Sequence, residues 1–167
     1  MKLYVMRHGA AEERAASHID ADRALTAAGR DRVRRVALAL LEAGEEPHEM
    51  FTSPLVRAVQ TAEILAHTTR LGERGAIVSA RREIAPAGDL GGLVRVLALE
   101  IHKRVMLVGH EPDLSALVAT LAGRMDQPFD KAMVVGIQVN GGGASGKLRF
   151  VLDPKTLRMH AEAPDDS

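Results

Sequence analysis

Short apolar runs and longer amphipathic segments alternate along this chain. Residues 2–6 and 104–108 are short and dominated by apolar side chains, which is typical of strands buried on both faces of a sheet. Between such runs, apolar residues recur every three or four positions, as they do on one face of a helix. This alternation predicts a mostly parallel sheet covered by helices on both faces, a three-layer α/β/α arrangement.

The boundaries of these elements follow from capping and turn residues. Thr26 is expected to cap a helix that ends near Gly44, and Asp89 and Pro112 to begin two further helices. Residues 10–24 have no clear period and predict a loop. The turn-rich stretch 140–146 predicts an antiparallel hairpin at the sheet edge. The expected strands are 2–6, 48–52, 76–78, 104–108, 133–139 and 147–152, with a helix at 55–67 besides the three named.

Length and composition narrow the class of protein. The 167 residues predict one domain over 1–160 and a polar tail over 161–167. The 22 basic and 22 acidic side chains give zero net charge, which argues against a general nucleic-acid binder. Neither a signal peptide nor an apolar run long enough to cross a membrane is evident. We therefore expect a cytoplasmic protein with no membrane or nucleic-acid partner.

Candidate chemistry lies directly after the expected strands. Arg7 and His8 follow the first strand, Arg57 lies one turn beyond the second, and His110 follows the strand at 104–108. Ligands of open α/β sheets bind outside the carboxyl ends of the strands, so these four side chains are expected to converge. Arginine binds phosphoryl oxygens in a bidentate manner, and a neutral imidazole can attack phosphorus. The set predicts phosphoryl chemistry without a metal or cofactor.

These residues belong to four motifs that resemble those of the histidine phosphatase superfamily, which has the phosphoglycerate mutase-like fold. The motifs occur in the order found in that superfamily and together span residues 1 to about 122. They are Met6-Arg7-His8-Gly9, Leu25-Thr26-Ala27-Ala28-Gly29, Ser53-Pro54-Leu55-Val56-Arg57-Ala58-Val59-Gln60-Thr61 and Val108-Gly109-His110-Glu111-Pro112. Each motif alone is a weak signal, but the ordered set is specific.

Within the superfamily, the chain is most similar to the short phosphohistidine phosphatases of the SixA type. It has no long insertion between Thr61 and Val105, and its segment 83–89 resembles a Glu-Leu-x-Pro-x-Gly-Asp stretch of that subfamily. The resemblance implies that His8 is the nucleophile and becomes phosphorylated, and that a phosphohistidine-bearing protein is the substrate. It also implies that Arg7 and Arg57 bind the phosphoryl oxygens and that His110 supplies a further donor.

The general acid is the least defined role. Glu83 is the nearest candidate by position and Asp89 the second, although Glu83 could equally be structural. An imidazole has a pKa of about 6.5, so it needs far less protonation to leave than an alkoxide does. An enzyme without a well-placed acid should therefore favour P–N over P–O bonds. Two alternatives stay open: a phosphomonoesterase for a sugar phosphate or nucleotide, and a phosphate-binding regulatory module without turnover.

Other polar residues near the motifs have simpler interpretations. Ser53 is expected mainly to cap the following helix, with phosphate binding as the alternative. The absence of Cys and of a closely spaced histidine pair argues against a zinc site. Five histidines match no motif and are expected at the surface or in ordinary structural positions: His18, His48, His67, His102 and His160. For His18, which lies in the loop after the first motif, the alternative is that it lines the mouth of the site.

Overall fold

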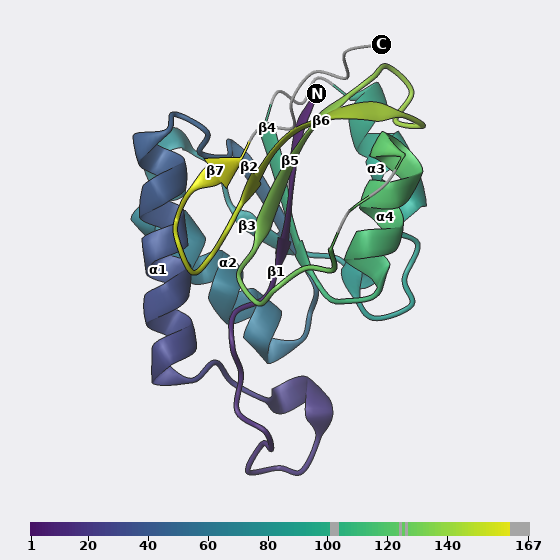
Figure 1. Ribbon diagram of the computed structural model, residues 1–167. Coiled ribbons are helices and arrows are strands. Elements are labelled where there is room, and N and C mark those ends of the chain that lie inside the picture. Colours follow the sequence, from purple (N-terminus) through teal and green to yellow (C-terminus); the bar gives the residue numbers. More distant parts are fainter. Residues whose placement is uncertain (101–103, 124, 126, 161–167) are drawn as a thin grey trace.

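The computed structural model describes residues 1–100, 104–123, 125 and 127–160, and these form a seven-stranded sheet flanked by helices (Figure 1). The tail 161–167 and His102 lie outside the described residues. The strands are β1 (Lys2–Arg7), β2 (Glu49–Thr52), β3 (Val78–Ala80), β4 (Arg104–Gly109), β5 (Val134–Val139), β6 (Gly146–Leu152) and β7 (Met159–His160). The helices are α1 (Ala27–Glu42), α2 (Val56–Thr68), α3 (Leu90–Leu99) and α4 (Asp113–Ala122).

The sheet has the order β3-β2-β4-β1-β5-β6-β7. The strands from β3 to β1 pair in parallel, whereas β5, β6 and β7 each pair antiparallel to the strand before them in this order. The predicted fold class, with its antiparallel hairpin, is confirmed. The two-residue strand β7 was not expected, because so short a segment carries no readable period.

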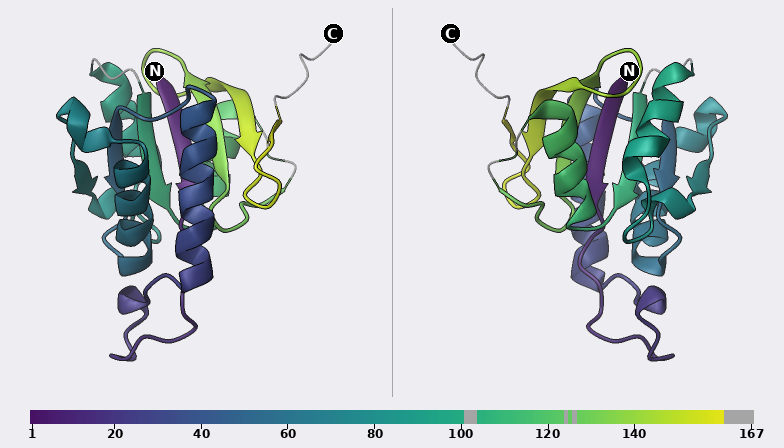
Figure 2. Two further views of the ribbon diagram at one scale, coloured as in Figure 1. Left: turned by 90° about the vertical axis from the view of Figure 1, so that its left-hand side faces the viewer. Right: turned by 90° about the vertical axis from the view of Figure 1, so that its right-hand side faces the viewer.

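Helices cover both faces of the sheet, with α1 and α2 on one side and α3 and α4 on the other (Figure 2). The central strand β1 contributes to both layers because its side chains alternate. Leu3 and Val5 are buried with α3 and α4, while Tyr4 and Met6 are buried with α1 and α2. The continuous apolar run thus reflects a strand with two covered faces, as its composition predicts.

Two helix caps confirm the boundaries expected from the sequence. The Thr26 hydroxyl accepts a hydrogen bond from Gly29 N at 2.9 Å at the start of α1, and Asp89 accepts one from Gly92 N at 2.8 Å at the start of α3. The expectation that Ser53 caps the following helix was wrong. The N-cap residue of α2 is Leu55, and no side chain caps this helix.

The segment between β1 and α1 extends beyond the carboxyl end of β1 as a projecting loop, which is defined here as residues 10–26 (Figures 1 and 2). It is not structureless: residues 20–22 form a 3₁₀ turn. Its two ends are joined, since the Ala10 carbonyl accepts a hydrogen bond from Thr26 N at 3.0 Å. The loop therefore returns the chain to α1 beside the residues that follow β1.

The third parallel strand begins two residues later than the sequence pattern suggested. The expected strand was 76–78, and the observed β3 is Val78–Ala80. Ile77 is 76% exposed, so this apolar residue lies at the surface and outside the sheet. Among the described residues, no helix is both long enough and apolar enough to cross a bilayer.

Candidate active site

The carboxyl ends of three neighbouring strands bring three of the expected side chains together. His8 follows β1, His110 follows β4, and Arg57 lies in the first turn of α2 after β2. Their exposed fractions are only 6%, 5% and 5%. The two imidazole rings have centroids 5.1 Å apart and planes inclined by 55°. Buried histidine and arginine side chains at one sheet edge are uncommon in a purely structural role.

His8 is oriented by the carbonyl group next to it in the chain. Its Nδ1 atom lies 2.7 Å from the Gly9 carbonyl oxygen, which can only accept a hydrogen bond, so Nδ1 carries the proton. Burial is the main cause that lowers the pKa of His8 to about 3; the nearby His110, Arg57 and Arg7 act in the same direction, and the bond to the Gly9 carbonyl opposes them. His8 is thus neutral at physiological pH, with Nε2 unprotonated and basic.

His110 contacts Ser53, the residue that follows β2. Its Nε2 atom lies 2.7 Å from the Ser53 hydroxyl oxygen, and the same oxygen accepts a hydrogen bond from Leu55 N at 3.3 Å. Burial, together with the positive charge of Arg57, lowers the pKa of His110 to about 4, although the carboxylates of Asp113 and Asp20 oppose them. Ser53 therefore orients an imidazole in addition to contacting the start of α2.

Arg57 is held by the projecting loop. Its Nη1 donates to the Asp20 carbonyl at 2.9 Å, and its Nη2 donates to the Asp20 carboxylate at 3.0 Å. The hydroxyl of Thr61 connects the same helix to the segment that follows β1, because it donates to the Arg57 carbonyl at 2.7 Å and accepts from Gly9 N at 3.0 Å. The guanidinium of Arg57 and the backbone beside His8 are thereby fixed relative to each other.

Arg7 is held from the opposite side of the site. Its Nη1 donates to the Phe129 carbonyl at 2.7 Å. The N–H of Phe129 in turn donates to the Glu111 carboxylate at 2.7 Å, which also accepts from Ser115 at 2.6 Å. Glu111 directly follows His110, so this chain of contacts connects Arg7 to the segment that carries the second histidine.

Polar atoms without partners are concentrated at this site. In the described part of the chain, four buried side-chain nitrogen or oxygen atoms have no hydrogen-bond partner, and three of them are Arg7 Nε, Arg57 Nε and His110 Nδ1. The fourth, in Glu46, lies 3.7 Å from Arg104 in an ion pair. Leaving such groups without partners costs free energy, and native structures keep few of them. The cluster fits a site shaped to donate hydrogen bonds to an anionic ligand.

The candidate acids lie in less informative positions. Glu83 is half-buried in a 3₁₀ turn after β3, and the described residues provide no hydrogen bond or ion pair to its carboxylate. The neighbouring Ile84 packs near Gly109 at the end of β4, which places the turn close to the site. Asp89 is exposed and caps α3, so its carboxylate already has a structural partner.

Two residues make contacts at the site that the sequence did not specify. Asp20 lies in a segment without a regular hydrophobic pattern, and the residues next to it in the sequence do not indicate a contact with α2. Glu111 belongs to the motif that carries His110, and its position next to His110 suggests that it orients a neighbour, but its partner Phe129 is distant in sequence. Within the described residues, no group of three His, Asp or Glu side chains is arranged to hold a metal ion.

Comparisons with known proteins agree with the motifs. The model of the histidine phosphatase superfamily (branch 1) matches residues 3–84. An uncharacterized protein of Picosynechococcus sp. is 39% identical over 144 residues, which are 83% of this chain and 85% of that protein. Phosphohistidine phosphatase SixA of Escherichia coli is 29% identical over 163 residues, which are 95% of this chain and 98% of the relative.

Solved structures extend the likeness to the whole fold. The structure of the protein histidine phosphatase SixA complexed with tungstate has a TM-score of 0.85 and 28% identity, and the match covers 95% of this chain and 100% of that one. A mycobacterial glucosyl-3-phosphoglycerate phosphatase, with a TM-score of 0.62 and 18% identity, shares the fold alone. This chain belongs to the histidine phosphatase superfamily and is a phosphatase of the histidine type, similar to SixA over most of its length.

Proposed function

We propose that this phosphatase removes phosphoryl groups from phosphohistidine in proteins, through a covalent phosphohistidine at His8. The observation that carries the proposal is the state of His8: a buried, neutral imidazole whose Nδ1 is bound to the Gly9 carbonyl, which leaves Nε2 as the free base. A nucleophile needs such a lone pair, held in a fixed direction.

The reaction has two steps. In the first, Nε2 of His8 attacks phosphorus, the new N–P bond forms, and the P–N bond of the substrate breaks, so that the substrate imidazole leaves with the electron pair and takes up a proton. In the second, water attacks the phosphorylated His8 and releases inorganic phosphate, and the imidazole is restored. Arg7 and Arg57 stabilise the phosphoryl oxygens electrostatically, and His110 transfers protons between water and the leaving group.

The preference for a P–N bond rests on two observations. The Escherichia coli relative that matches almost the whole chain is a phosphohistidine phosphatase. In addition, none of the residues that the structure describes holds the Glu83 carboxylate in place as an acid. Imidazole leaves with much less protonation than an alkoxide, so the substrate class tolerates a weakly placed acid. We assign Glu83 a supporting role as general acid at most.

Trapping of the intermediate tests the proposal. The wild-type protein and His8→Ala are incubated with a phosphoryl donor and analysed by mass spectrometry without acid, alongside His160→Ala as a control at an exposed histidine. We expect phosphate on His8 in the wild type and in the control, and none in His8→Ala. Equal labelling of His8→Ala and wild type would overturn the mechanism.

The choice of substrate has its own test. Values of kcat/KM are compared for a phosphohistidine peptide and a panel of sugar phosphates and nucleotides. A much higher value for an ester would indicate a small-molecule phosphomonoesterase. Binding of phosphate analogues without release of phosphate from any substrate would indicate a non-catalytic module.

A further inference from the structure

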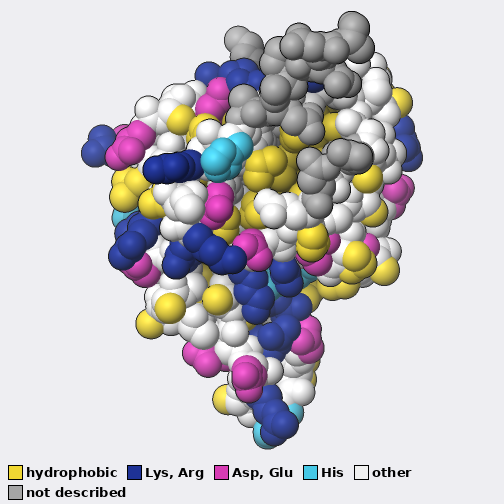
Figure 3. Space-filling view, in the orientation of Figure 1, with side chains coloured by type: hydrophobic (Ala, Val, Ile, Leu, Met, Phe, Trp, Pro, Cys, Tyr) yellow, Lys and Arg dark blue, Asp and Glu magenta, His cyan; other side chains and the backbone are white. Residues whose placement is uncertain are grey.

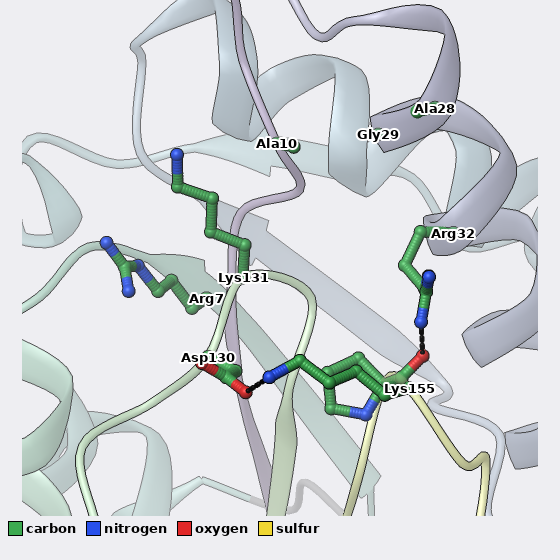
Figure 4. A pocket seen from close by; sticks show the side chains of 9 residues that line it. Arg7, Ala10, Ala28, Gly29, Arg32, Asp130, Lys131 and Lys155 are labelled. Carbon is green, nitrogen blue, oxygen red and sulfur yellow. Dashed lines mark hydrogen bonds and ion pairs between the residues drawn. The ribbon is translucent and has the colours of Figure 1, made fainter.

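A basic hollow adjoins the proposed phosphoryl site (Figure 4). It has a volume of about 440 Å³ and lies among the residues after β1, the first turns of α1 and the loops before β5 and after β6. Small apolar residues form part of its wall, and charged side chains form its rim. It is lined by Arg7, Ala10, Ala28, Gly29, Arg32, Asp130, Lys131, Pro154 and Lys155.

Hydrogen bonds attach the walls of this basic hollow to the segment that carries His8. The N–H of Ala132 lies 3.1 Å from the Arg7 carbonyl and 3.2 Å from the His8 carbonyl, which holds the backbone next to Lys131 beside the nucleophile. On the other side, Gly29 packs so closely on the Ala10 backbone that a side chain at Gly29 would collide with it. The hollow is therefore a fixed neighbour of the phosphoryl site.

The basic hollow carries uncompensated positive charge. Its lining holds four basic side chains and one acidic one, Asp130, which pairs with Lys155 at 2.8 Å. Arg32 donates to the neutral carbonyl of Pro154, and Arg7 to the neutral carbonyl of Phe129. No ion pair within the described part of the chain involves Lys131. Three positive charges thus remain, although the whole chain has zero net charge. Figure 3 shows Lys and Arg side chains gathered above the projecting loop on the face drawn there.

We propose that the basic hollow receives an acidic side chain that neighbours the phosphohistidine on the substrate protein. The inference rests on the proposed function, and it adds a specificity site to it. A bound water takes about 30 Å³, and the hollow is far larger. It therefore has room for an Asp or Glu side chain together with part of the backbone of that residue. The cationic rim pairs with the carboxylate, and the walls formed by Ala10, Ala28 and Pro154 contact its methylene groups.

Paired peptides test this inference. The test compares two phosphohistidine peptides of otherwise identical sequence. One has Asp, and the other has Asn, at the two positions before and the two positions after the phosphohistidine. For the wild type at low salt, we expect kcat/KM to be about tenfold higher for the Asp peptide, since exposed charge pairs are individually weak and several of them act together here. The preference should shrink as salt is raised to about 1 M, where the Debye length is about 3 Å.

Substitutions in the basic hollow test whether the preference for the Asp peptide arises there. Arg32→Gln with Lys131→Gln should bring the ratio of the two kcat/KM values close to one, and Lys131→Glu should reverse it. The matched control is Arg34→Gln with Lys147→Gln, which removes two exposed positive charges outside the hollow and should keep the preference. Because the readout is a ratio within one protein, a general loss of folding or activity cancels.

The outcomes separate the two proposals. Hydrolysis of both peptides with equal kcat/KM, or a preference that survives Arg32→Gln with Lys131→Gln, would overturn the acidic-side-chain site and leave the phosphohistidine phosphatase intact. Hydrolysis of neither peptide by the wild type would overturn the proposed function itself, and with it the inference that rests on it.

Discussion

Asp20 contacts Arg57 through both its backbone carbonyl and its carboxylate, at 2.9 and 3.0 Å. The carboxylate is two-thirds exposed, whereas the guanidinium is almost completely buried. Burial raises the pKa of Asp20, but the hydrogen bonds and charges of Arg57 and Arg23 outweigh this effect and hold the pKa below its usual range. The projecting loop thus supplies a permanent anion to a side chain that we propose binds phosphate.

Asp20→Ala should impair catalysis more than stability. The substitution removes the carboxylate contact and leaves Arg57 only its contact with the backbone carbonyl of residue 20. The guanidinium is then held less firmly towards the phosphoryl oxygens, and we expect kcat/KM to fall about tenfold, which corresponds to about 1.4 kcal/mol. The control is Asp22→Ala in the same 3₁₀ turn, whose carboxylate contacts Ser17 instead. A rise in activity in Asp20→Ala would show that Asp20 competes with phosphate rather than positioning Arg57.

Glu83→Gln should separate the two classes of phosphoryl substrate. If the carboxyl group protonates leaving oxygens, the variant loses more activity towards a phosphomonoester than towards phosphohistidine. We expect less than a threefold fall for the P–N substrate, because imidazole leaves with little acid assistance. Steady-state kinetics on both substrates measure the effect. A loss of a hundredfold on phosphohistidine would assign Glu83 an essential role.

Acid should destabilise the protein through its two buried histidines. The pKa of His8 is lowered to about 3 and that of His110 to about 4, whereas both are near 6.5 in an unfolded chain. Between these values the unfolded chain binds more protons than the folded one. The free energy of unfolding therefore falls as pH is lowered from about 6.5 towards 4, by at most about 1.4 kcal/mol per pH unit for each group.

Denaturant titrations at several pH values check this slope. The variant His8→Gln with His110→Gln should show a flatter dependence than the wild type, whatever its absolute stability. His160→Gln, at an exposed position, should keep the wild-type slope. Equal slopes for the wild type and the double variant would assign the acid sensitivity to other groups.

Gly29→Ala should affect both folding and the site. A Cβ at this position in α1 would collide with the Ala10 carbonyl, so the projecting loop has to move away from the helix. Overpacking of this kind costs about 1–3 kcal/mol of stability. Gly91→Ala is the matched control, because a Cβ in that helical turn would meet its nearest atom at 3.6 Å. Thermal unfolding of both variants tests the difference, and equal melting temperatures would contradict it.

The sequence alone determined most of the fold and the composition of the proposed site. Hydrophobic periodicity reports how each segment is buried, and for the long strands and helices it identified both type and approximate position. The predicted strands also indicate that the motif residues lie near one another, because parallel strands place their carboxyl ends at one edge of the sheet. His8, His110, Arg7 and Arg57 could therefore be named before any contact was known.

Only the tertiary structure decided which other residues meet them. Asp20 contacts Arg57 across 37 residues, and Phe129 contacts Arg7 across 122. Such contacts depend on how loops close, and loops carry no periodic signal that places them. The position of Lys131 beside His8 likewise depends on backbone hydrogen bonds between distant segments. Local sequence determines how a segment is buried, whereas long-range packing determines which charged side chains share a surface.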